Sequence, residues 1–460
     1  MNRRQFGQTA LLAGGAALFG KALSRVGAAP GVLAQGLPSL PSPESSGIEH
    51  IVTVSMENRS FDHFFGWLPN ADRQQAGLTY VDSNGVAHPT HSLSGDNTGC
   101  PAPDPDHSYA GARVEYNGGA MDGFLRAGSN DLYSIGYYGE NDIPFYASLA
   151  RNYTACDRYF SAILGPTFPN RMFLYAAQTD RLTDSVAPST LPTIFDSLAN
   201  ANVSQAYYFS NVPYLALWGT KYAGIAKTYS QFQQDAANGT LPAISFLDPR
   251  YTVLDDGTGN DDHPHADIRE GDRFLYDVFE AVSKGPGWSS TLLIVNFDEW
   301  GGFFDHVAPP RAKAANQVDP DIVDGKTLLG FRVPIVVASP FSAGNPASPT
   351  INSLVFDHTS VLKLIEWRWN LPPLTPRDAS SDVNNLAYVL DFNNPQTAVP
   401  TLSKPDTPFF AMPCFANLFG SGIFSPELSR PGATPPASSR RTALWGDLRT
   451  MARQNGFPVK

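Results

Sequence analysis

Cysteine and charge are both scarce in this sequence of 460 residues. Its 3 cysteines, Cys100, Cys156 and Cys414, are widely spaced and form no CxxC motif, so a zinc-finger type of site is not indicated. The odd count leaves at least one thiol unpaired, and the pairing of any disulfide stays open. Charged residues make up only 16% and the net charge is -11, which argues against nucleic acid as a partner.

Long apolar runs are absent as well. A transmembrane helix needs about 20 apolar residues, and no such run occurs, so no transmembrane segment is predicted in the mature chain. The N-terminus carries Arg3 and Arg4 ahead of a short apolar stretch, Thr9 to Phe19, which cannot span a bilayer. Small residues follow, with a plausible cleavage site at Val32-Leu33-Ala34. This pattern resembles a twin-arginine export signal.

The organisation that follows is a signal over residues 1–34, a Pro/Ser-rich linker over 35–46, and a single catalytic domain over 47–460. The apolar share of 42% is ample for a large core. The signal implies the twin-arginine export machinery as a partner and the periplasm or the cell exterior as the destination.

Apolar strand-like segments alternate with amphipathic helical segments along this domain. Strands are predicted over 48–54, 160–164, 291–297 and 333–338, and helices over 144–151, from Pro169 onward, 271–284 and 359–370. The nearly continuous apolar run 291–297 is typical of a strand that is buried on both faces. The predicted fold is therefore α/β, a doubly wound, mostly parallel sheet with helices on both faces and a long loop excursion over 70–120.

Polar residues follow three of the predicted strands: Glu57-Asn58, Thr167 and Asp298-Glu299. Ligands of open parallel sheets bind at the carboxyl ends of the strands, so these side chains are expected to converge. Carboxylate, amide and hydroxyl oxygens are ligands for a divalent cation, and a cation would activate the hydroxyl. Acidic residues at a single strand end often only cap a helix, but three such clusters indicate a site.

Histidines support the same interpretation, because five of the nine directly follow an aspartate. With 43 acidic residues in the chain, about one such pair is expected by chance. These pairs are Asp62-His63, Asp106-His107, Asp262-His263, Asp305-His306 and Asp357-His358. The last directly precedes a predicted helix and suits a cap. His107, His263 and His306 lie in loops rich in Gly, Pro and Asp, and are the candidates for acid–base chemistry.

Thr167 stands in the segment Gly165-Pro166-Thr167-Phe168-Pro169-Asn170-Arg171, at the predicted start of a helix. A hydroxyl there is well placed for phosphoryl transfer, because free amides and the helix dipole favour an incoming anion. The alternative is an ordinary N-cap threonine, which the sequence pattern does not exclude.

Four segments in order resemble the bacterial phosphoesterase family that contains phospholipases C and certain acid phosphatases, within the alkaline-phosphatase superfamily. They are residues 57–63, residues 165–171, Asp262-His263-Pro264, and residues 298–306 (DEWGGFFDH), and the resemblance spans about residues 46 to 395. It implies a metal site of Glu57, Asn58, Thr167, Asp298 and Glu299. It also implies Thr167 as nucleophile, and His107, His263 and His306 near the transferred phosphoryl group.

Arg171 and Asn58 are the expected substrate contacts, with Arg171 either orienting the helix or binding phosphate. The metal identity stays open. Oxygen ligands suit Ca²⁺, Mg²⁺ or Mn²⁺ better than Zn²⁺, although the superfamily often uses zinc. The pattern Thr-x-Pro-x-Arg is also similar to that of sulfatases, but threonine does not yield the formylglycine aldehyde that they need.

Three functions fit these residues. The first is phospholipase C-type cleavage of phospholipid phosphodiesters, with a phosphoester such as a phospholipid as the substrate. The second is an acid phosphatase acting on monoesters. A non-catalytic exported binding protein is the third, and the intact Thr167 and ligand set argue against it.

The export signal generates a first prediction. Replacing Arg3 and Arg4 by lysines should leave the precursor in the cytoplasm, because the arginine pair ahead of a weakly apolar segment is the feature that the export route recognises. Fractionation of cells that express the wild-type and twin-lysine precursors measures this. An unchanged yield outside the cytoplasm would contradict the assignment.

Overall fold

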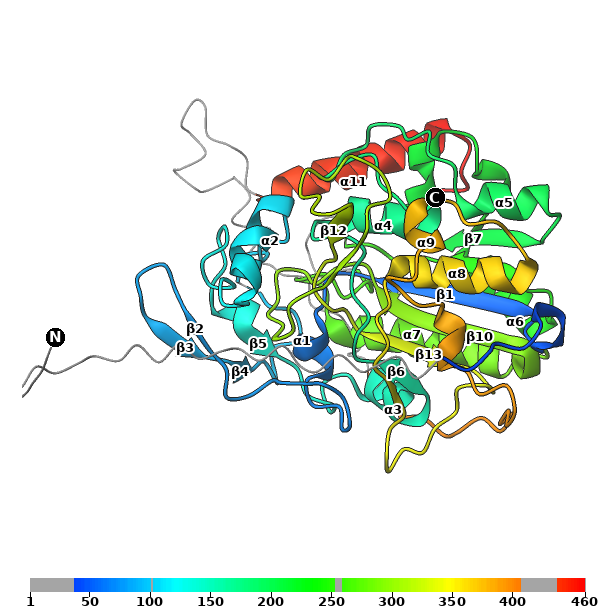
Figure 1. Ribbon diagram of the computed structural model, residues 1–460, viewed down its shortest axis with the longest axis horizontal. Helices are drawn as coiled ribbons and strands as arrows, with labels where there is room; N and C mark the ends of the chain where they lie inside the picture. Colours follow the sequence, from blue (N-terminus) through cyan, green and yellow to red (C-terminus); the bar gives the residue numbers. More distant parts are fainter. Residues whose placement is uncertain (1–36, 101, 253–258, 407–436, 460) are drawn as a thin grey trace, which may run out of the picture. The chain divides into compact units, whose positions relative to one another are not determined.

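A computed structural model describes residues 37–100, 102–252, 259–406 and 437–459 (Figure 1). The expected export signal lies outside these residues. Residues 41–460 form one compact unit, and the predicted domain limits stay a prediction. No helix in the described ranges combines the length and apolarity needed to cross a membrane. Cys100 is disulfide-bonded, whereas Cys156 is a free, buried thiol.

The core of the protein is an eight-stranded sheet in the order β14-β6-β13-β10-β1-β9-β7-β8. In chain order the strands are β1 (His50–Met56), β6 (Thr154–Cys156), β7 (Gln205–Phe209), β8 (Ala226–Thr228), β9 (Ile244–Leu247), β10 (Thr291–Phe297), β13 (Ile335–Ala338) and β14 (Ile351–Asn352). Only β13 runs against its neighbours among these strands. Every residue of β10 is buried, which explains its continuous apolar sequence.

Helices cover both faces of the sheet. Helices α4, α5, α8 and α9 pack side by side on one face, and α3, α6 and α7 pack together on the other (Figure 1). The helices are α1 (Phe61–Phe65), α2 (Tyr109–Tyr116), α3 (Pro144–Asn152), α4 (Thr167–Ala176), α5 (Ile194–Asn200), α6 (Tyr229–Asn238), α7 (Ile268–Ser283), α8 (His358–Trp369), α9 (Pro376–Ala379) and α11 (Ala437–Gln454). The predicted doubly wound, mostly parallel α/β fold is confirmed.

Minor sheets and the loop excursion lie outside the main sheet. The pairs are β2 (Thr79–Val81) with β3 (Ala87–Pro89), β4 (His91–Ser92) with β5 (Gly136–Tyr137), and β11 (Arg311–Lys313) with β12 (Lys326–Leu328). The excursion is not a free loop, because Tyr80 and Ala112 pack with Trp300 and Phe304 in a common core cluster. It is thereby joined to the segment that follows β10.

One predicted strand is wrong. Residues 160–164 form no strand; Phe160 and Ser161 instead donate their backbone N–H groups to Phe356 and Phe331 in isolated contacts. The run is followed by Gly165-Pro166 and has no neighbouring strand to continue the ladder, so its apolar character reflects a buried loop. The strand that precedes Thr167 in the chain is β6, and this buried loop joins it to α4.

His63 is a polar residue in the core that supports the loop after β1. Its Nδ1 donates to the Gly136 carbonyl (2.8 Å), its Nε2 accepts from Arg59 (2.9 Å), and its ring stacks on Phe303 at 3.8 Å between centroids. Burial and the adjacent Arg59 charge hold the pKa of His63 well below its ordinary value of 6.5. The folded protein therefore keeps this imidazole neutral.

His63 should make the fold sensitive to acid. Above about pH 6.5 the ring is neutral in both states; below it only the unfolded chain binds the proton, so stability falls as pH falls. Through this one group the free energy of unfolding should fall by up to about 1.4 kcal/mol for each pH unit below that point. Denaturant unfolding of the wild type and His63→Gln across pH 8 to 5 measures it. The difference in free energy of unfolding between the two proteins should be constant above pH 7. Parallel plots of this free energy against pH below pH 6 would contradict the prediction.

Candidate functional site

Strands β1 and β10 are adjacent and parallel, with Met56 opposite Phe297 at their carboxyl ends. The dipeptides that follow, Glu57-Asn58 and Asp298-Glu299, therefore leave the sheet side by side. The Asn58 N–H donates to Asp298 Oδ1 at 3.1 Å, which ties the two turns together. All four side chains are buried. Two of the three predicted polar clusters thus meet at one edge of the sheet.

Backbone geometry holds these turns in place. Asn58 has a φ of 61°, a left-handed conformation that asparagine tolerates better than most residues. Gly301 also has a positive φ, 65°, and its N–H donates to Glu299 Oε2 at 2.7 Å. A Cβ at Gly301 would stand 2.2 Å from the Asn58 carbonyl oxygen, so only glycine fits there.

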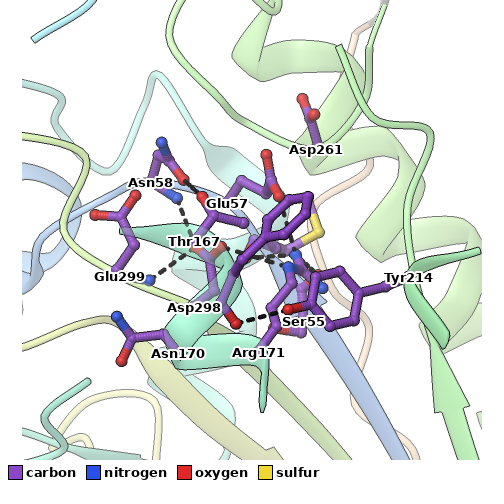
Figure 2. A network of polar contacts seen from close by, with 12 residues as sticks. Ser55, Glu57, Asn58, Thr167, Asn170, Arg171, Tyr214, Asp261, Asp298 and Glu299 are labelled. Carbon is purple, nitrogen blue, oxygen red and sulfur yellow. Dashed lines mark hydrogen bonds and ion pairs between the residues drawn. The ribbon is translucent and has the colours of Figure 1, made fainter. Parts of the chain in front are cut away.

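Thr167 reaches the same place from α4. Its hydroxyl donates to Asn58 Oδ1 at 3.4 Å, and the residue is almost fully buried. Figure 2 shows Thr167 among Glu57, Asn58, Asp298 and Glu299. The helix begins at Thr167 itself, and Pro166 occupies the cap position without a side-chain cap. The N-cap interpretation of this threonine is therefore wrong, because its hydroxyl is directed to the acidic turns instead.

Asp184 takes the part of a cap residue at the start of α4, because its carboxylate accepts a hydrogen bond from a free backbone N–H of the first turn. The Phe168 N–H donates to Asp184 Oδ1 at 2.8 Å, and the Asn170 side chain bonds the carbonyls of Ile163 (3.2 Å) and Gly165 (2.7 Å). These bonds fix the turn that precedes Thr167. The orientation of the hydroxyl is thus determined by residues on both sides of it.

Arg171 lies one helical turn after Thr167 and is fully buried. Its guanidinium is 3.4 Å from Glu57, 2.9 Å from Asp248 and 3.4 Å from Asp298, and Nη2 donates to the Ser55 carbonyl at 3.1 Å. Burial alone would lower its pKa, but Tyr251 and the three carboxylates raise it well above the ordinary value. Arg171 is therefore a permanent cation placed beneath the acidic cluster.

One cation does not neutralise this cluster. Burial raises the pKa of Asp298, although Arg171 opposes the shift, and burial together with the charge of Asp298 raises that of Glu299 well above its ordinary value. Glu299 Oε1 has no hydrogen-bond partner in the described part of the chain, and Asp298 Oδ2 has only the ion pair with Arg171 at 3.4 Å. Buried carboxylate oxygens without donors need a further positive charge. The oxygen donors of Glu57, Asn58, Thr167, Asp298 and Glu299 fit a hard divalent cation.

His107 and His263 stand beside this cluster. The Nδ1 of His107 donates to the Pro105 carbonyl (2.8 Å), and its Nε2 is 3.4 Å from Asn58 Nδ2. The Nδ1 of His263 donates to the Pro264 carbonyl (2.9 Å), and the two rings are 5.8 Å apart. Both carbonyl contacts direct the Nε2 atoms away from the backbone. Asp104, 3.8 Å from His263 Nε2, completes a group whose ligand atoms lie within 4.8 Å of one another.

His306 has other partners. Its Nδ1 contacts Asp62 at 2.5 Å and its Nε2 contacts Asp72 at 3.1 Å. Burial would lower its pKa, but hydrogen bonding to Asp62 and the negative charge nearby raise it. Asp62, Asp305 and His306 also form a possible cation-binding group, yet Arg332 already pairs with both carboxylates, at 3.1 and 3.0 Å. No described contact joins this ion network to Thr167.

A pocket of about 610 Å³ opens beside the nucleophile candidate. Its lining comes from five stretches of the chain. The lining residues are Asp104, Pro105, Asp106, His107, Ser108, Tyr109, Gly128, Ser129, Pro166, Thr183, Asp184 and Leu444. Since Pro166 and His107 border it, a phosphoester bound at Thr167 would place one of its substituents here.

Two residues of the site were missed by sequence reasoning. Asp248 directly follows β9, so the rule that found Glu57 and Asp298 applies to it, but β9 is short and was not predicted. Asp104 lies in a proline-rich segment without periodicity and gives no sequence signal. The predicted cap role of Asp357 is confirmed by a capping box at α8, while His358 donates to the Asp298 carbonyl at 2.6 Å.

Comparison with known proteins assigns this chain to a family. The Phosphoesterase family matches residues 48–372. Non-specific phospholipase C6 of Arabidopsis thaliana is 33% identical in an alignment 387 positions long that covers 75% of this chain and 72% of the relative. Phospholipase C A of Mycobacterium tuberculosis is 32% identical in an alignment 478 positions long, gaps included, that covers 88% of each chain.

Solved structures show only a distant similarity. The phosphonate monoester hydrolase of Agrobacterium radiobacter aligns with a TM-score of 0.35 at 10% identity, covering 75% of this chain and 78% of that one. A protein in the alkaline phosphatase superfamily from Vibrio parahaemolyticus aligns with a TM-score of 0.34 at 9% identity, covering 72% and 69%. The sequence relatives and the family match are decisive: the chain belongs to the Phosphoesterase family and is a phosphoric ester hydrolase.

Proposed function

We propose that the protein hydrolyses phosphoric esters with a divalent metal ion and Thr167 as the nucleophile, and that its substrates are phospholipid phosphodiesters cleaved in the manner of phospholipase C. The observation that carries this proposal is the Thr167 hydroxyl, directed at Asn58 inside a buried set of oxygen donors rather than capping its own helix. A buried hydroxyl that stands at a helix start without capping that helix suits nucleophilic attack on phosphorus.

The reaction would take two steps. In the first, a bond forms between Thr167 Oγ and phosphorus while the hydroxyl proton passes to one of His107 and His263, and the ester bond to the alcohol breaks. The departing alcohol takes a proton from the other histidine. In the second, water gives a proton to that second histidine and attacks phosphorus, the Oγ–phosphorus bond breaks, and Thr167 Oγ regains its proton from the first. Two inversions retain the configuration at phosphorus overall.

Glu57, Asn58, Thr167, Asp298 and Glu299 would hold the cation. When bound, such an ion lowers the pKa of a hydroxyl and stabilises charge on phosphoryl oxygens. The protein contributes the position of the ligands: Asn58 bonds both Asp298 and Thr167, at 3.1 and 3.4 Å. Elemental analysis of the purified protein would show which metal is bound among Ca²⁺, Mg²⁺, Mn²⁺ and Zn²⁺.

His107 and His263 would supply and accept the protons. Both rings hold Nδ1 on a backbone carbonyl, which orients Nε2 for transfer. Arg171 would act by positioning the carboxylates and not by binding phosphate, because all of its described contacts lie beneath them. His306 would support the fold through Asp62 and Arg332 rather than take part in the transfer.

Phosphodiester cleavage is favoured over phosphatase action by the names of the relatives, which are phospholipases C in both a plant and a bacterium. The pocket beside Thr167 supports it, since it has room for a substituent beyond the phosphate. Export through the twin-arginine pathway to the periplasm or cell exterior remains part of the proposal.

Metal dependence is tested by a change that keeps side-chain shape. Glu299→Gln removes one charge from the proposed ligand set, so we expect less bound metal and at least about a 10-fold loss of kcat. Metal content is measured by elemental analysis before and after treatment with a chelator. Glu366→Gln, which changes a buried acid on α8, is the matched control and should leave both the metal content and kcat unchanged. Full activity of metal-free protein would end the proposal.

The nucleophile is tested at Thr167. Thr167→Val removes the hydroxyl and nearly conserves shape, so kcat should fall at least about 10³-fold while the melting temperature stays close to that of the wild type. Thr167→Ser should keep partial activity. The assay uses p-nitrophenyl phosphorylcholine, on which we expect a higher kcat/KM than on p-nitrophenyl phosphate.

Thr53→Val is the control for this substitution, because Thr53 is a buried threonine within β1. It should leave kcat unchanged. A folded, metal-replete Thr167→Val protein with near-normal turnover would exclude Thr167 as the nucleophile, and a preference for the monoester would favour the phosphatase.

A further inference from the structure

The C-terminal helix α11 lies outside the segment that the Phosphoesterase family matches, yet it borders the site. The family match ends at residue 372, whereas α11 runs from Ala437 to Gln454. Leu444 of this helix lines the 610 Å³ pocket together with Ser108 and Tyr109 of the α2 region. Figure 1 shows α11 beside α2, in agreement with that lining. The helix also packs against the 3-10 helix Tyr214–Trp218.

Trp445 is the residue by which α11 is anchored. Its side chain is 2% exposed. One face stacks on Tyr251 at 4.3 Å between ring centroids and 28° between planes, and Phe168 meets it edge-on at 5.6 Å. Trp445 therefore fills the space between two aromatic rings from distant parts of the chain.

Both of these rings adjoin the proposed machinery. Phe168 directly follows Thr167, and its carbonyl accepts from the Tyr214 hydroxyl at 2.6 Å. Tyr251 lies under the Arg171 guanidinium at 4.9 Å, and Arg171 pairs with Glu57 and Asp298. A displacement of Trp445 would be transmitted to the nucleophile through Phe168 and to the carboxylates through Tyr251.

We propose that Trp445 is a positioning residue for the hydrolytic reaction, which holds the Thr167 segment and the Arg171–carboxylate cluster at a fixed separation. The proposal rests on the function assigned to Thr167 above. On this proposal, α11 contributes to the reaction by positioning residues of the site. Near-attack geometry is sensitive to small shifts: a displacement of about 1 Å costs about 100-fold in rate.

Removing the indole is the direct test. Trp445→Leu should lower kcat for p-nitrophenyl phosphorylcholine by about 10- to 100-fold, with KM changed less than about threefold, because positioning affects the transition state more than binding. Trp445→Phe keeps an aromatic ring against Tyr251 and should restore most of kcat. Metal content should stay that of the wild type in both variants.

A matched control separates positioning from stability. Trp288 is another buried tryptophan, packed edge-on against Tyr153 and Phe279 next to the start of β10, at the opposite end of that strand from Asp298. Trp288→Leu should lower the melting temperature comparably and leave kcat unchanged. Asp447→Ala, at an exposed position on α11, should change neither quantity.

The outcomes decide the proposal. A kcat of Trp445→Leu equal to that of Trp288→Leu, or a loss confined to KM, would overturn it. If Trp445→Leu does not fold, Tyr251→Leu takes its place: it removes the ring between Trp445 and Arg171, and an unchanged kcat would overturn the proposal equally. Thr167→Val in the same assay separates the two proposals: near-normal turnover of Thr167→Val would overturn the proposed function, whereas a loss in Thr167→Val with an unchanged kcat in Trp445→Leu would overturn only the positioning role.

Discussion

A single buried guanidinium holds the functional edge of this protein together. Arg171 contacts Glu57 after β1, Asp248 after β9 and Asp298 after β10, so it joins the carboxyl ends of three neighbouring strands. Uncompensated, each buried carboxylate would cost several kcal/mol, on the order expected for isolated ions. Thr167 lies four residues before Arg171 on α4, which puts both on the same helix face. The helix that carries the compensating charge therefore also brings Thr167, the proposed nucleophile, to the acids.

The charge balance explains why the site suits a cation. Arg171 faces Glu57, Asp248 and Asp298, and Glu299 adds another carboxylate whose Oε1 has no donor among the described residues. Burial raises the pKa values of Asp298 and Glu299, and the charge of Asp298 raises that of Glu299 further. A divalent ion would restore both carboxylates to their ionised form. The same excess would repel a phosphate group from the bare site, so substrate and cation are expected to bind together.

Sequence reasoning recovered the sheet class and the polar turns after β1 and β10, because long apolar strands with acids at their ends are a local signal. The ion network that His306 forms with Asp62 and Arg332 gave no sequence signal, since an Asp-His pair looks the same in such a network as in an active site; the catalytic role of His306 stays a prediction. Asp248 was missed because β9 has only four residues. The contact between Trp445 and Phe168 joins segments that lie far apart in the chain, and no local pattern encodes it.

This separation along the chain has a consequence for assembly. The proposed site draws on five distant segments, so it forms only after the sheet, α4 and α11 have packed. Its residues from these segments are Glu57, Thr167, His263, Asp298 and Trp445. A metal ion held by Glu57, Asn58, Thr167, Asp298 and Glu299 would bind to the folded chain and stabilise it by mass action. A route that exports proteins already folded allows the ion to be loaded before translocation. The twin-arginine signal expected at residues 1–34 fits that order of events.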